Sequence, residues 1–439
     1  MTNTLQVQKY LDALVHLDPV RINGKVTQVI GLTVESEGPD ARIGDVCQIV
    51  RAGTGDSVLA EVVGFRGNRL ILMPFGELES IGPGCDVVGT GRQLTVRVGF
   101  ELLGKVLNGL GEPLDGSRLP STMQQYATNR RPGNPLRRPR VLEPLSVGIR
   151  CIDGLLTVGK GQRVGIFAGS GVGKSTLLGM IARNTSADVN VIALIGERGR
   201  EVLDFIERDL GPEGLARSVV VVATSDQPAL IRMKGALIAT TIAEFFRDRG
   251  LNVMLMMDSI TRYAMALREV GLAIGEPPAT RGYTPSVFAN LPKLLERSGT
   301  GPKGSITAFY TVLVEGDDMS EPIADAVRGI LDGHIVLDRN LANRGHYPAI
   351  DVLASVSRVM KEIVPAEQIA AAEQLKRLLS IYKNSEDLIN LGAYQAGSNP
   401  QIDLAIQYID RIWEFTRQRI DEKVDYEESR NRLIETFGG

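Results

Sequence analysis

The sequence is poor in the residues that build disulfide frameworks and structural metal sites. Its 439 residues include three cysteines, Cys47, Cys85 and Cys151, and three histidines, with no spacing typical of paired ligands. Neither a disulfide framework nor a zinc site is indicated, and a reducing, cytosolic compartment is therefore expected.

Long apolar runs and a strong charge of one sign are also missing. Apolar runs such as Val253–Met257 are far shorter than the roughly 20 residues of a membrane span. The N-terminus has no basic region followed by an apolar stretch, so no signal peptide is expected. Forty-nine basic and fifty-two acidic residues give a net charge of −3, which offers no global field to attract nucleic acid. This composition and length are typical of an enzyme of two or three domains.

The chain does contain a phosphate-binding loop. An apolar run beginning at Arg163 predicts a buried strand, and a glycine-rich turn and an apolar helical pattern follow it, as such a loop requires. Strict versions of the motif begin with glycine, but alanine is small enough for the same turn. The residues predicted to contact the nucleotide are Ala168, Gly169, Ser170, Gly171, Val172, Gly173, Lys174, Ser175 and Thr176.

Each part of this loop has a physical role. The glycines let successive backbone N–H groups point at phosphate oxygens, and the following helix N-terminus adds its positive dipole end. Lys174 can reach the β- and γ-phosphates, and the Ser175 hydroxyl can bind Mg²⁺. The loop therefore predicts binding of a nucleoside triphosphate with Mg²⁺.

Apolar strands alternate with helical segments from Arg150 to about Asp338. Such a pattern is typical of a parallel sheet that helices cover on both faces, so an α/β core is predicted. The predicted strands are Val164–Phe167, Val189–Ile195, Val219–Ala223, Val253–Met257 and Ile306–Val314.

Shorter β-rich pieces precede this core, and glycine-containing turns separate them. They predict a small antiparallel barrel or sandwich. No aromatic platform or basic stripe accompanies them, which argues against binding of oligonucleotides. The predicted strands are Val26–Val34, Val46–Arg51, Val58–Phe65 and Arg69–Phe75.

The ends of the chain and one internal segment have other patterns. Residues 1–18 have apolar spacing typical of a helix that either packs on its own domain or docks a partner. Residues 120–146 are rich in proline and arginine and favour an extended linker over a basic contact site. After Arg358 the pattern is helical, mainly at Ala366–Tyr382 and Leu404–Val424. The predicted domains are a docking helix (1–18), a β-barrel (19–92), a catalytic domain (93–358) and a helical domain (359–439).

Two acidic residues follow predicted strands of the core. In an open parallel sheet, ligands bind at the carboxyl ends of the strands. Asp258 ends one apolar run, so it could complete the Mg²⁺ shell or simply cap the next helix. Glu197 follows another strand, where a carboxylate could polarise an attacking water or be a surface charge.

Several motifs resemble the catalytic ATPases of the rotary F1/V1 class, which have a RecA-like core. The resemblance covers nearly the whole chain. Within the class, the sequence from Ile152 to Arg163 is similar to that of the type III secretion branch. The phosphate loop and residues 392–400 resemble the flagellar protein-export ATPases in particular. The motifs that carry the class resemblance are Ala168–Thr176, Gly196–Glu201, Gly282–Ser286, Tyr347–Asp351 and Ser355–Val359.

The resemblance implies roles for individual residues. Glu197 matches the glutamate that activates water, and Arg198 the arginine beside it that reaches the γ-phosphate. Tyr347 matches the aromatic residue that stacks on adenine. Arg358 matches the arginine finger, which acts on the nucleotide of a neighbouring subunit. Without the resemblance, Tyr347 could be a packed turn residue and Arg358 a salt-bridged base.

The resemblance also implies an assembly and its partners. We expect a homohexamer of three-domain subunits that hydrolyses Mg²⁺-ATP to energise flagellar protein export, at the cytoplasmic side of the inner-membrane export apparatus. The implied partners are stator-like regulatory and central-stalk export proteins, the membrane export gate, export substrates and chaperones. The loop at Gly392–Asn399 is short and uncharged, unlike the acidic loop of F-type synthases, so an identical stalk contact is doubtful.

The sequence leaves four alternatives open. Two share the fold, namely an injectisome secretion ATPase and a proton-translocating ATPase subunit. A Rho-like nucleic-acid motor would need basic or aromatic residues along a ring pore, and the barrel region does not offer them. A regulatory nucleotide binder without hydrolysis is disfavoured because the acidic Glu197 is present.

Overall fold

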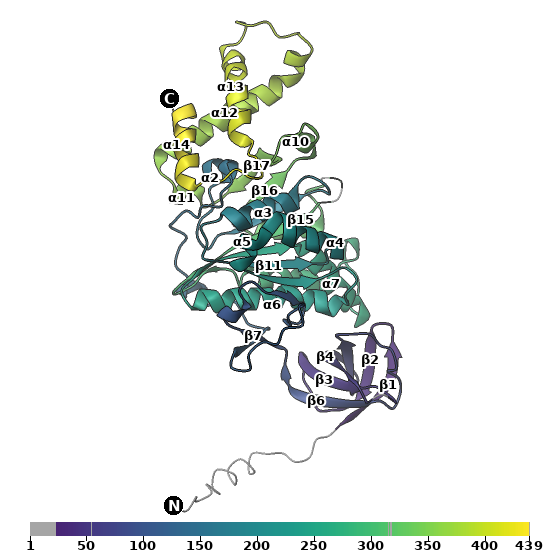
Figure 1. The fold of residues 1–439 in the computed structure, drawn as a ribbon. Helices are drawn as coiled ribbons and strands as arrows, with labels where there is room; N and C mark the ends of the chain where they lie inside the picture. Colours follow the sequence, from purple (N-terminus) through teal and green to yellow (C-terminus); the bar gives the residue numbers. More distant parts are fainter. Residues whose placement is uncertain (1–22, 54, 315, 317, 439) are drawn as a thin grey trace, which may run out of the picture. The chain divides into compact units, whose positions relative to one another are not determined.

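A computed structural model describes residues 23–438 except 54, 315 and 317. The described chain divides into two compact units (Figure 1). One unit runs up to Leu94 and includes Ala273–Gly275, and the other contains the rest of the chain. The predicted docking helix at residues 1–18 lies outside the described residues.

The first unit is a closed antiparallel barrel, as predicted, with strand order β1-β2-β5-β4-β3-β6. The single strand predicted at Val26–Val34 is wrong, because the chain turns at Gly31 (φ +55°) and forms two strands there. The sixth strand was not predicted. The strands are β1 Gly24–Ile30, β2 Thr33–Glu37, β3 Asp45–Val50, β4 Ser57–Arg66, β5 Arg69–Pro74 and β6 Asp86–Gln93.

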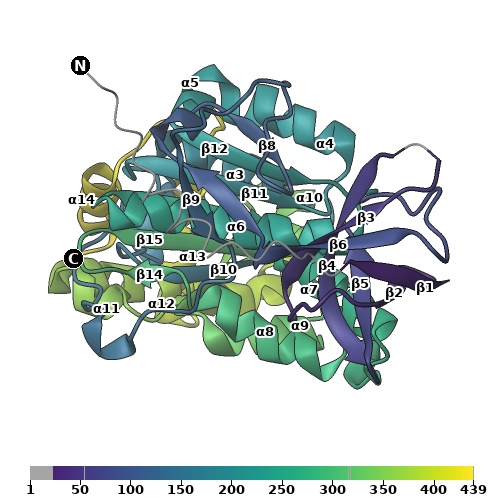
Figure 2. The same cartoon turned by 90° about the horizontal axis from the view of Figure 1, so that it is seen from below.

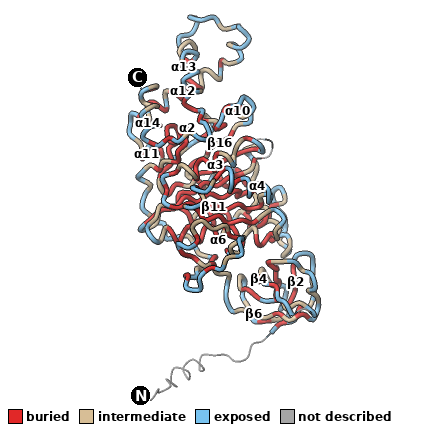
Figure 3. Tube along the Cα trace, in the orientation of Figure 1, coloured by how far each residue is buried: buried red, intermediate tan, exposed pale blue. Residues whose placement is uncertain are grey.

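A sheet of nine strands forms the centre of the second unit, in the order β17-β16-β10-β15-β13-β11-β12-β8, with β14 paired to β15. The central strands β10, β11, β12, β13 and β15 are almost wholly buried, whereas the edge strand β17 is partly exposed (Figure 3). The bounds are β8 Val106–Asn108, β10 Arg163–Ala168, β11 Val189–Ile195, β12 Ser218–Ala223, β13 Asn252–Asp258, β14 Gly299–Thr300, β15 Ser305–Leu313, β16 Gly333–Leu337 and β17 Ile350–Ser357.

The α/β core is confirmed, and all five of its predicted strands are present. The prediction of a parallel sheet is wrong at two places, because β14 and the edge strand β17 run antiparallel to their neighbours. The chain passes from β10 out to β11 and β12, returns through β13 and β15, and reaches β16 on the other side of β10. This reversal beside β10 is where a doubly wound sheet binds ligands.

Helices cover both faces of the sheet, with α3 and α6 on opposite sides of the strands (Figure 1). The long helix α6 packs across β11, β12 and β13, and Figure 2 shows it from below. The bounds are α2 Arg150–Leu155, α3 Lys174–Asn184, α4 Gly199–Asp204, a π-helix Phe205–Leu210, α5 Gly211–Ala216, α6 Ala229–Asp248, α7 Ile260–Ala273, α8 Pro285–Leu295, α9 Pro322–Ile330 and α10 Arg339–Asn343.

The end of the chain is helical, as predicted, in α11 Met360–Ile363, α12 Ala366–Asn390, α13 Pro400–Thr416 and α14 Tyr426–Phe437. The helix predicted at Leu404–Val424 is wrong beyond Thr416, where the backbone becomes extended at Arg417. The linker predicted at 120–146 is mostly irregular, but its segment β9 Gln124–Ala127 pairs with β7 Thr95–Val98. Short 3₁₀ turns lie at Phe100–Leu102, Pro135–Arg137 and Thr280–Gly282.

Within the described range, every helix is too short or too polar to cross a lipid bilayer.

Candidate nucleotide-binding site

The carboxyl ends of three parallel strands bring the phosphate loop, Glu197 and Asp258 to one edge of the sheet. β10 ends at Ala168, whose register partner on β15 is Leu313. On the far side of β15, Asp258 ends β13 and pairs in register with Leu194 of β11. The phosphate loop follows β10, and Glu197 follows β11, so both emerge beside Asp258.

The phosphate loop turns at two glycines with positive φ, Gly171 (φ +79°) and Gly173. Gly173 lies just before α3 with φ +90°, a conformation that favours glycine. A Cβ added at Gly173 would lie 3.3 Å from Cε1 of Tyr347, so the tyrosine ring is close to the loop. Arg339 also contacts the loop, because its guanidinium donates a hydrogen bond to the Ser170 carbonyl at 3.3 Å.

Lys174 lies between two carboxylates in the buried part of the site. Its Nζ forms an ion pair with Oδ1 of Asp258 and lies 3.7 Å from Oε1 of Glu197. Asp258 is 4% exposed, and the Thr311 hydroxyl donates to the same Oδ1 at 2.7 Å. The Asp258 carboxylate therefore contacts the loop lysine and does not cap the helix that follows it.

This environment changes the protonation of both Glu197 and Lys174. Burial, and then repulsion from Asp258, raise the pKa of Glu197 to about 7, against the opposing effect of Lys174. Burial alone would lower the pKa of Lys174, but the attraction of Asp258 and Glu197 outweighs it and raises that pKa. The lysine stays charged at neutral pH, whereas Glu197 is poised near neutrality to accept a proton.

The turn after β11 aims Glu197 at this site. Gly196 has φ +72°, and a Cβ added there would lie 2.8 Å from Cβ of Arg262, so only glycine fits. Arg198 follows Glu197, but its side chain is 70% exposed and pairs with Glu201 at 3.2 Å. The structure thus brings Lys174, Glu197 and Asp258 together, while Arg198 points to solvent.

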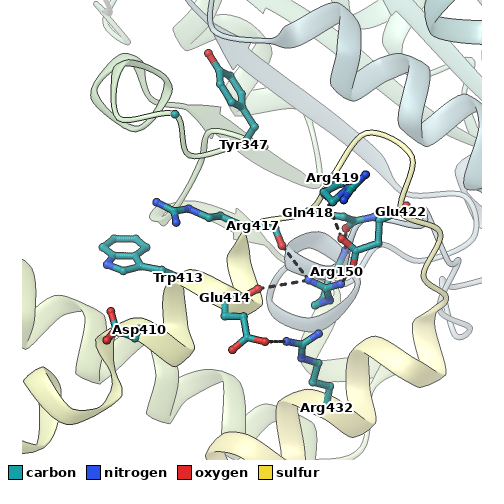
Figure 4. A pocket seen from close by; sticks show the side chains of 11 residues that line it. Arg150, Tyr347, Asp410, Trp413, Glu414, Arg417, Gln418, Arg419, Glu422 and Arg432 are labelled. Carbon is teal, nitrogen blue, oxygen red and sulfur yellow. Dashed lines mark hydrogen bonds and ion pairs between the residues drawn. The ribbon is translucent and has the colours of Figure 1, made fainter.

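Tyr347 lines a cavity of about 590 Å³ beside the phosphate loop (Figure 4). Tyr347 is 45% exposed, so it is not a packed turn residue. The opposite side of the cavity comes from the end of α13 and the segment after it. The other lining residues are Arg150, Gly345, Asp410, Trp413, Glu414, Arg417, Gln418, Arg419, Glu422 and Arg432.

Arg358 lies at the other end of the sheet. Because β17 is antiparallel, Ile350 pairs with Leu337 near the phosphate loop, whereas Ser357 pairs with Gly333 at the amino end of β16. The eight residues of β17 span roughly 25 Å. Arg358 is exposed and donates to the carbonyls of Arg328 and Asp332. It therefore lies far from the phosphate loop of its own subunit.

The residues present fit a Mg²⁺ ion that binds with the nucleotide. Ser175 follows Lys174 at the start of α3, and Asp258 is the ion-pair partner of Lys174, so the Ser175 hydroxyl and the Asp258 carboxylate are the hard oxygen donors available to Mg²⁺. With both carboxylates ionised, Lys174, Glu197 and Asp258 carry a net negative charge. In residues 23–438, apart from the three gaps, no cluster of three or more His, Cys, Asp and Glu could hold a metal alone. Mg²⁺ usually relies on phosphate oxygens as well.

Sequence reasoning missed several residues of the site. Thr311 had a signal, because it is a polar side chain near the carboxyl end of an apolar strand. Arg417, Gln418 and Trp413 had none, because their distance in the sequence hides their closeness to Tyr347.

A parallel sheet with a phosphate loop after β10, and acids after two neighbouring strands, defines a P-loop ATPase with a RecA-like core. Comparison with known families agrees. Residues 148–357 match the nucleotide-binding domain of the ATP synthase alpha/beta family, and residues 26–91 match its beta-barrel domain. Residues 364–435 match the T3SS EscN ATPase C-terminal domain.

Comparison with individual relatives assigns the chain to a family within this class of ATPases. The chain is 59% identical over 435 residues to a flagellum-specific ATP synthase of Bacillus subtilis, covering 99% of both chains. It is 54% identical to a type 3 secretion system ATPase of Xanthomonas euvesicatoria, covering 92% of this chain and 91% of that one. The chain belongs to the family of flagellum-specific ATP synthases and type III secretion ATPases, and it is an ATPase.

A solved structure supports the fold. The assembled ATPase EscN of the enteropathogenic E. coli type III secretion system is 47% identical, with a TM-score of 0.89, covering 94% of this chain and 100% of that chain. EscN has also been solved in complex with its central stalk EscO.

Proposed function

We propose that the chain hydrolyses ATP to energise flagellar protein export, as a homohexamer with a nucleotide between neighbouring subunits. The observation that carries the catalytic part is the contact of Lys174 with Glu197 and with the buried Asp258. Glu197 orients the attacking water and accepts its proton, and Lys174 moves from Asp258 to the β- and γ-phosphates. Mg²⁺ held by Ser175 and Asp258 would neutralise charge on the phosphate oxygens.

The two arginines complete the site in different ways. Arg198 is exposed and held by Glu201, so rotation of its side chain would exchange that carboxylate for the γ-phosphate. Arg358 is remote from its own phosphate loop, which supports action on the neighbouring subunit. Adenine would lie in the cavity beside Tyr347. Each site thus combines the phosphate loop of one subunit with Arg358 of its neighbour, so identical subunits are enough to form complete sites.

The remaining partners are proposed from the relatives. The EscN–EscO complex supports a central stalk for this chain as well. Stator-like regulators, the export gate, substrates and chaperones follow from the flagellar assignment, as does a position at the cytoplasmic side of the inner membrane. The higher identity over the whole chain to the Bacillus subtilis flagellar relative favours this assignment over the injectisome alternative.

Expression of the chain in bacterial strains that lack their own ATPase tests the flagellar assignment. We expect it to restore motility and flagellin secretion in a Bacillus subtilis strain that lacks its flagellum-specific ATP synthase. It should not restore effector secretion in a Xanthomonas euvesicatoria strain that lacks its type 3 secretion ATPase. The Glu197→Gln variant, at matched protein level, is the inactive control in both strains. Restoration of the secretion strain alone would replace the flagellar assignment with the injectisome one.

The pKa of Glu197 predicts how activity depends on pH. A base with a pKa of about 7 is half deprotonated near pH 7 and about one-tenth deprotonated at pH 6. We expect kcat/KM, which reports the free enzyme, to fall roughly tenfold per pH unit below about pH 7. The measurement is the steady-state rate between pH 5.5 and 8.5, with binding of a non-hydrolysable analogue as the control. A flat profile down to pH 5.5 would contradict Glu197 as the base.

A further inference from the structure

The cavity beside Tyr347 has two walls that are joined by hydrogen bonds. Nε of Arg417 donates to Nδ1 of His346 at 3.1 Å, and the Gln418 N–H donates to the Tyr347 carbonyl at 3.0 Å. Consecutive residues of one wall thus bind consecutive residues of the other. The spacing between the walls is therefore fixed before any nucleotide enters.

Most polar groups of the second wall are used to hold it in place. Oε1 of Gln418 accepts from the Arg150 N–H at 2.8 Å, and its Nε2 donates to the Gly148 carbonyl at 2.9 Å. Arg150 in turn donates to the Arg417 carbonyl at 2.9 Å and pairs with Glu422. Gln418 and Arg150 also line the cavity, but both are buried and held by these bonds, so they support the wall.

Arg417 differs from these neighbours. It is exposed, lines the cavity, and uses Nε for its bond to His346. In Figure 4 its side chain lies between Tyr347 and Trp413. A guanidinium fixed through Nε still presents a flat face and its terminal nitrogens.

His346 fixes the orientation of this guanidinium. The imidazole is 2% exposed, and its ring packs edge-on against Trp413 at a centroid distance of 5.2 Å. Since Nδ1 accepts from Arg417, that nitrogen carries no proton. Burial, and then the charge of Arg417, lower the pKa of His346 to about 4, which keeps the ring neutral under physiological conditions.

We propose that Arg417 is the second base-binding residue of the site, and that its guanidinium stacks on the face of the purine opposite Tyr347. His346 is the positioning residue that holds it there. This inference rests on the proposed function, which places the base beside Tyr347. A guanidinium is planar and weakly hydrated, and it stacks well on aromatic faces. Stacking depends on the area of the base and not on its hydrogen-bonding edge.

Steady-state kinetics of Arg417→Ala with ATP, GTP and CTP test the proposal. We expect KM for ATP to rise about five- to thirtyfold while kcat stays within about twofold, because the contact lies far from the reacting phosphate. KM for GTP should rise as much, and KM for CTP less, because a pyrimidine offers less area. Arg417→Lys should resemble Arg417→Ala, because lysine keeps the charge but not the planar group.

Arg411→Ala is the matched control. Arg411 lies in α13, the helix that Arg417 follows, but its guanidinium covers the Tyr408 ring at 5.3 Å and it does not line the cavity. Its loss removes the same charge without touching the base, so KM should not change. An equal rise in KM for Arg411→Ala and Arg417→Ala would overturn the proposal, because it would show a general attraction of charge.

A second pair of variants tests the positioning role. His346→Phe keeps a ring against Trp413 but removes the acceptor, and it should raise KM for ATP like Arg417→Ala. His346→Asn returns an acceptor near the place of Nδ1 and should recover part of the affinity. A structural role alone would instead make both variants lower the melting temperature without separating their KM values, and that result would overturn the role of His346.

Trp413 provides a direct binding measurement, because it is the only tryptophan of the chain and lines the same cavity. Titration with ATP should change its fluorescence, and Arg417→Ala should shift the midpoint by the factor seen in KM. An active wild-type protein with unchanged KM in Arg417→Ala would overturn the proposal and leave the proposed function intact. A folded wild-type protein that neither binds nor hydrolyses ATP would overturn both.

Discussion

Glu197→Gln is expected to lower kcat for ATP hydrolysis about 10²–10⁴-fold, because it removes the base that accepts the water proton. ATP binding should persist, since Lys174 and the phosphate loop are untouched. The fold should also persist, because partial burial and repulsion from Asp258 raise the pKa of the replaced carboxyl, so its charge is not needed for stability. The measurements are single-turnover hydrolysis, binding monitored through Trp413, and thermal unfolding.

Two further variants are compared with Glu197→Gln. Lys174→Ala should weaken ATP binding roughly 10- to 150-fold as well as abolish turnover, because charged hydrogen bonds to phosphate are lost. It also leaves the buried Asp258 without its cation, so a lower melting temperature is expected. Glu207→Gln, at an exposed position of the π-helix, should leave kcat unchanged. Near wild-type hydrolysis by Glu197→Gln would show that another group is the base.

The core of the fold could be predicted because its strands are short, apolar and nearly continuous. β11, for example, is buried at all seven positions, so burial alone marks its bounds. Edge elements lacked this signal. Strand β17 alternates buried and exposed residues and pairs only with β16, and the turn at Gly31 divides what reads as one apolar run. Local patterns thus identify central strands better than they identify edges and turns.

Local sequence patterns also predict only part of the candidate site. Lys174, Asp258 and Glu197 follow strands in the parallel core, and the rule for strand ends is enough to bring them together. The cavity wall at Arg417 and Gln418 follows α13, about 70 residues after Tyr347, and only the tertiary structure joins them. The position of Arg358 at the far end of the sheet depends on the direction of β17, which its sequence pattern does not reveal.

The position of Arg358 predicts a second large loss of activity. If Arg358 stabilises the transition state on a neighbouring subunit, Arg358→Ala should lower kcat about 10³–10⁵-fold and leave nucleotide binding nearly unchanged. In the wild type, specific activity should rise with protein concentration as rings form, and the variant should lose that rise. The measurements are specific activity against concentration and, in parallel, the oligomeric state by light scattering. Constant specific activity from monomer to oligomer would contradict a shared site.

Mixing two inactive variants separates action on a neighbour from action within one subunit. A Glu197→Gln subunit keeps Arg358, and an Arg358→Ala subunit keeps Glu197, so a ring that contains both forms some complete sites. With equal amounts and random assembly, about a quarter of the interfaces should be complete and activity should recover up to that fraction. The control mixes Arg358→Ala with the double variant, which never forms a complete site. If Arg358 acted on its own subunit, the first mixture would be as inactive as the control, because no subunit in it carries both residues.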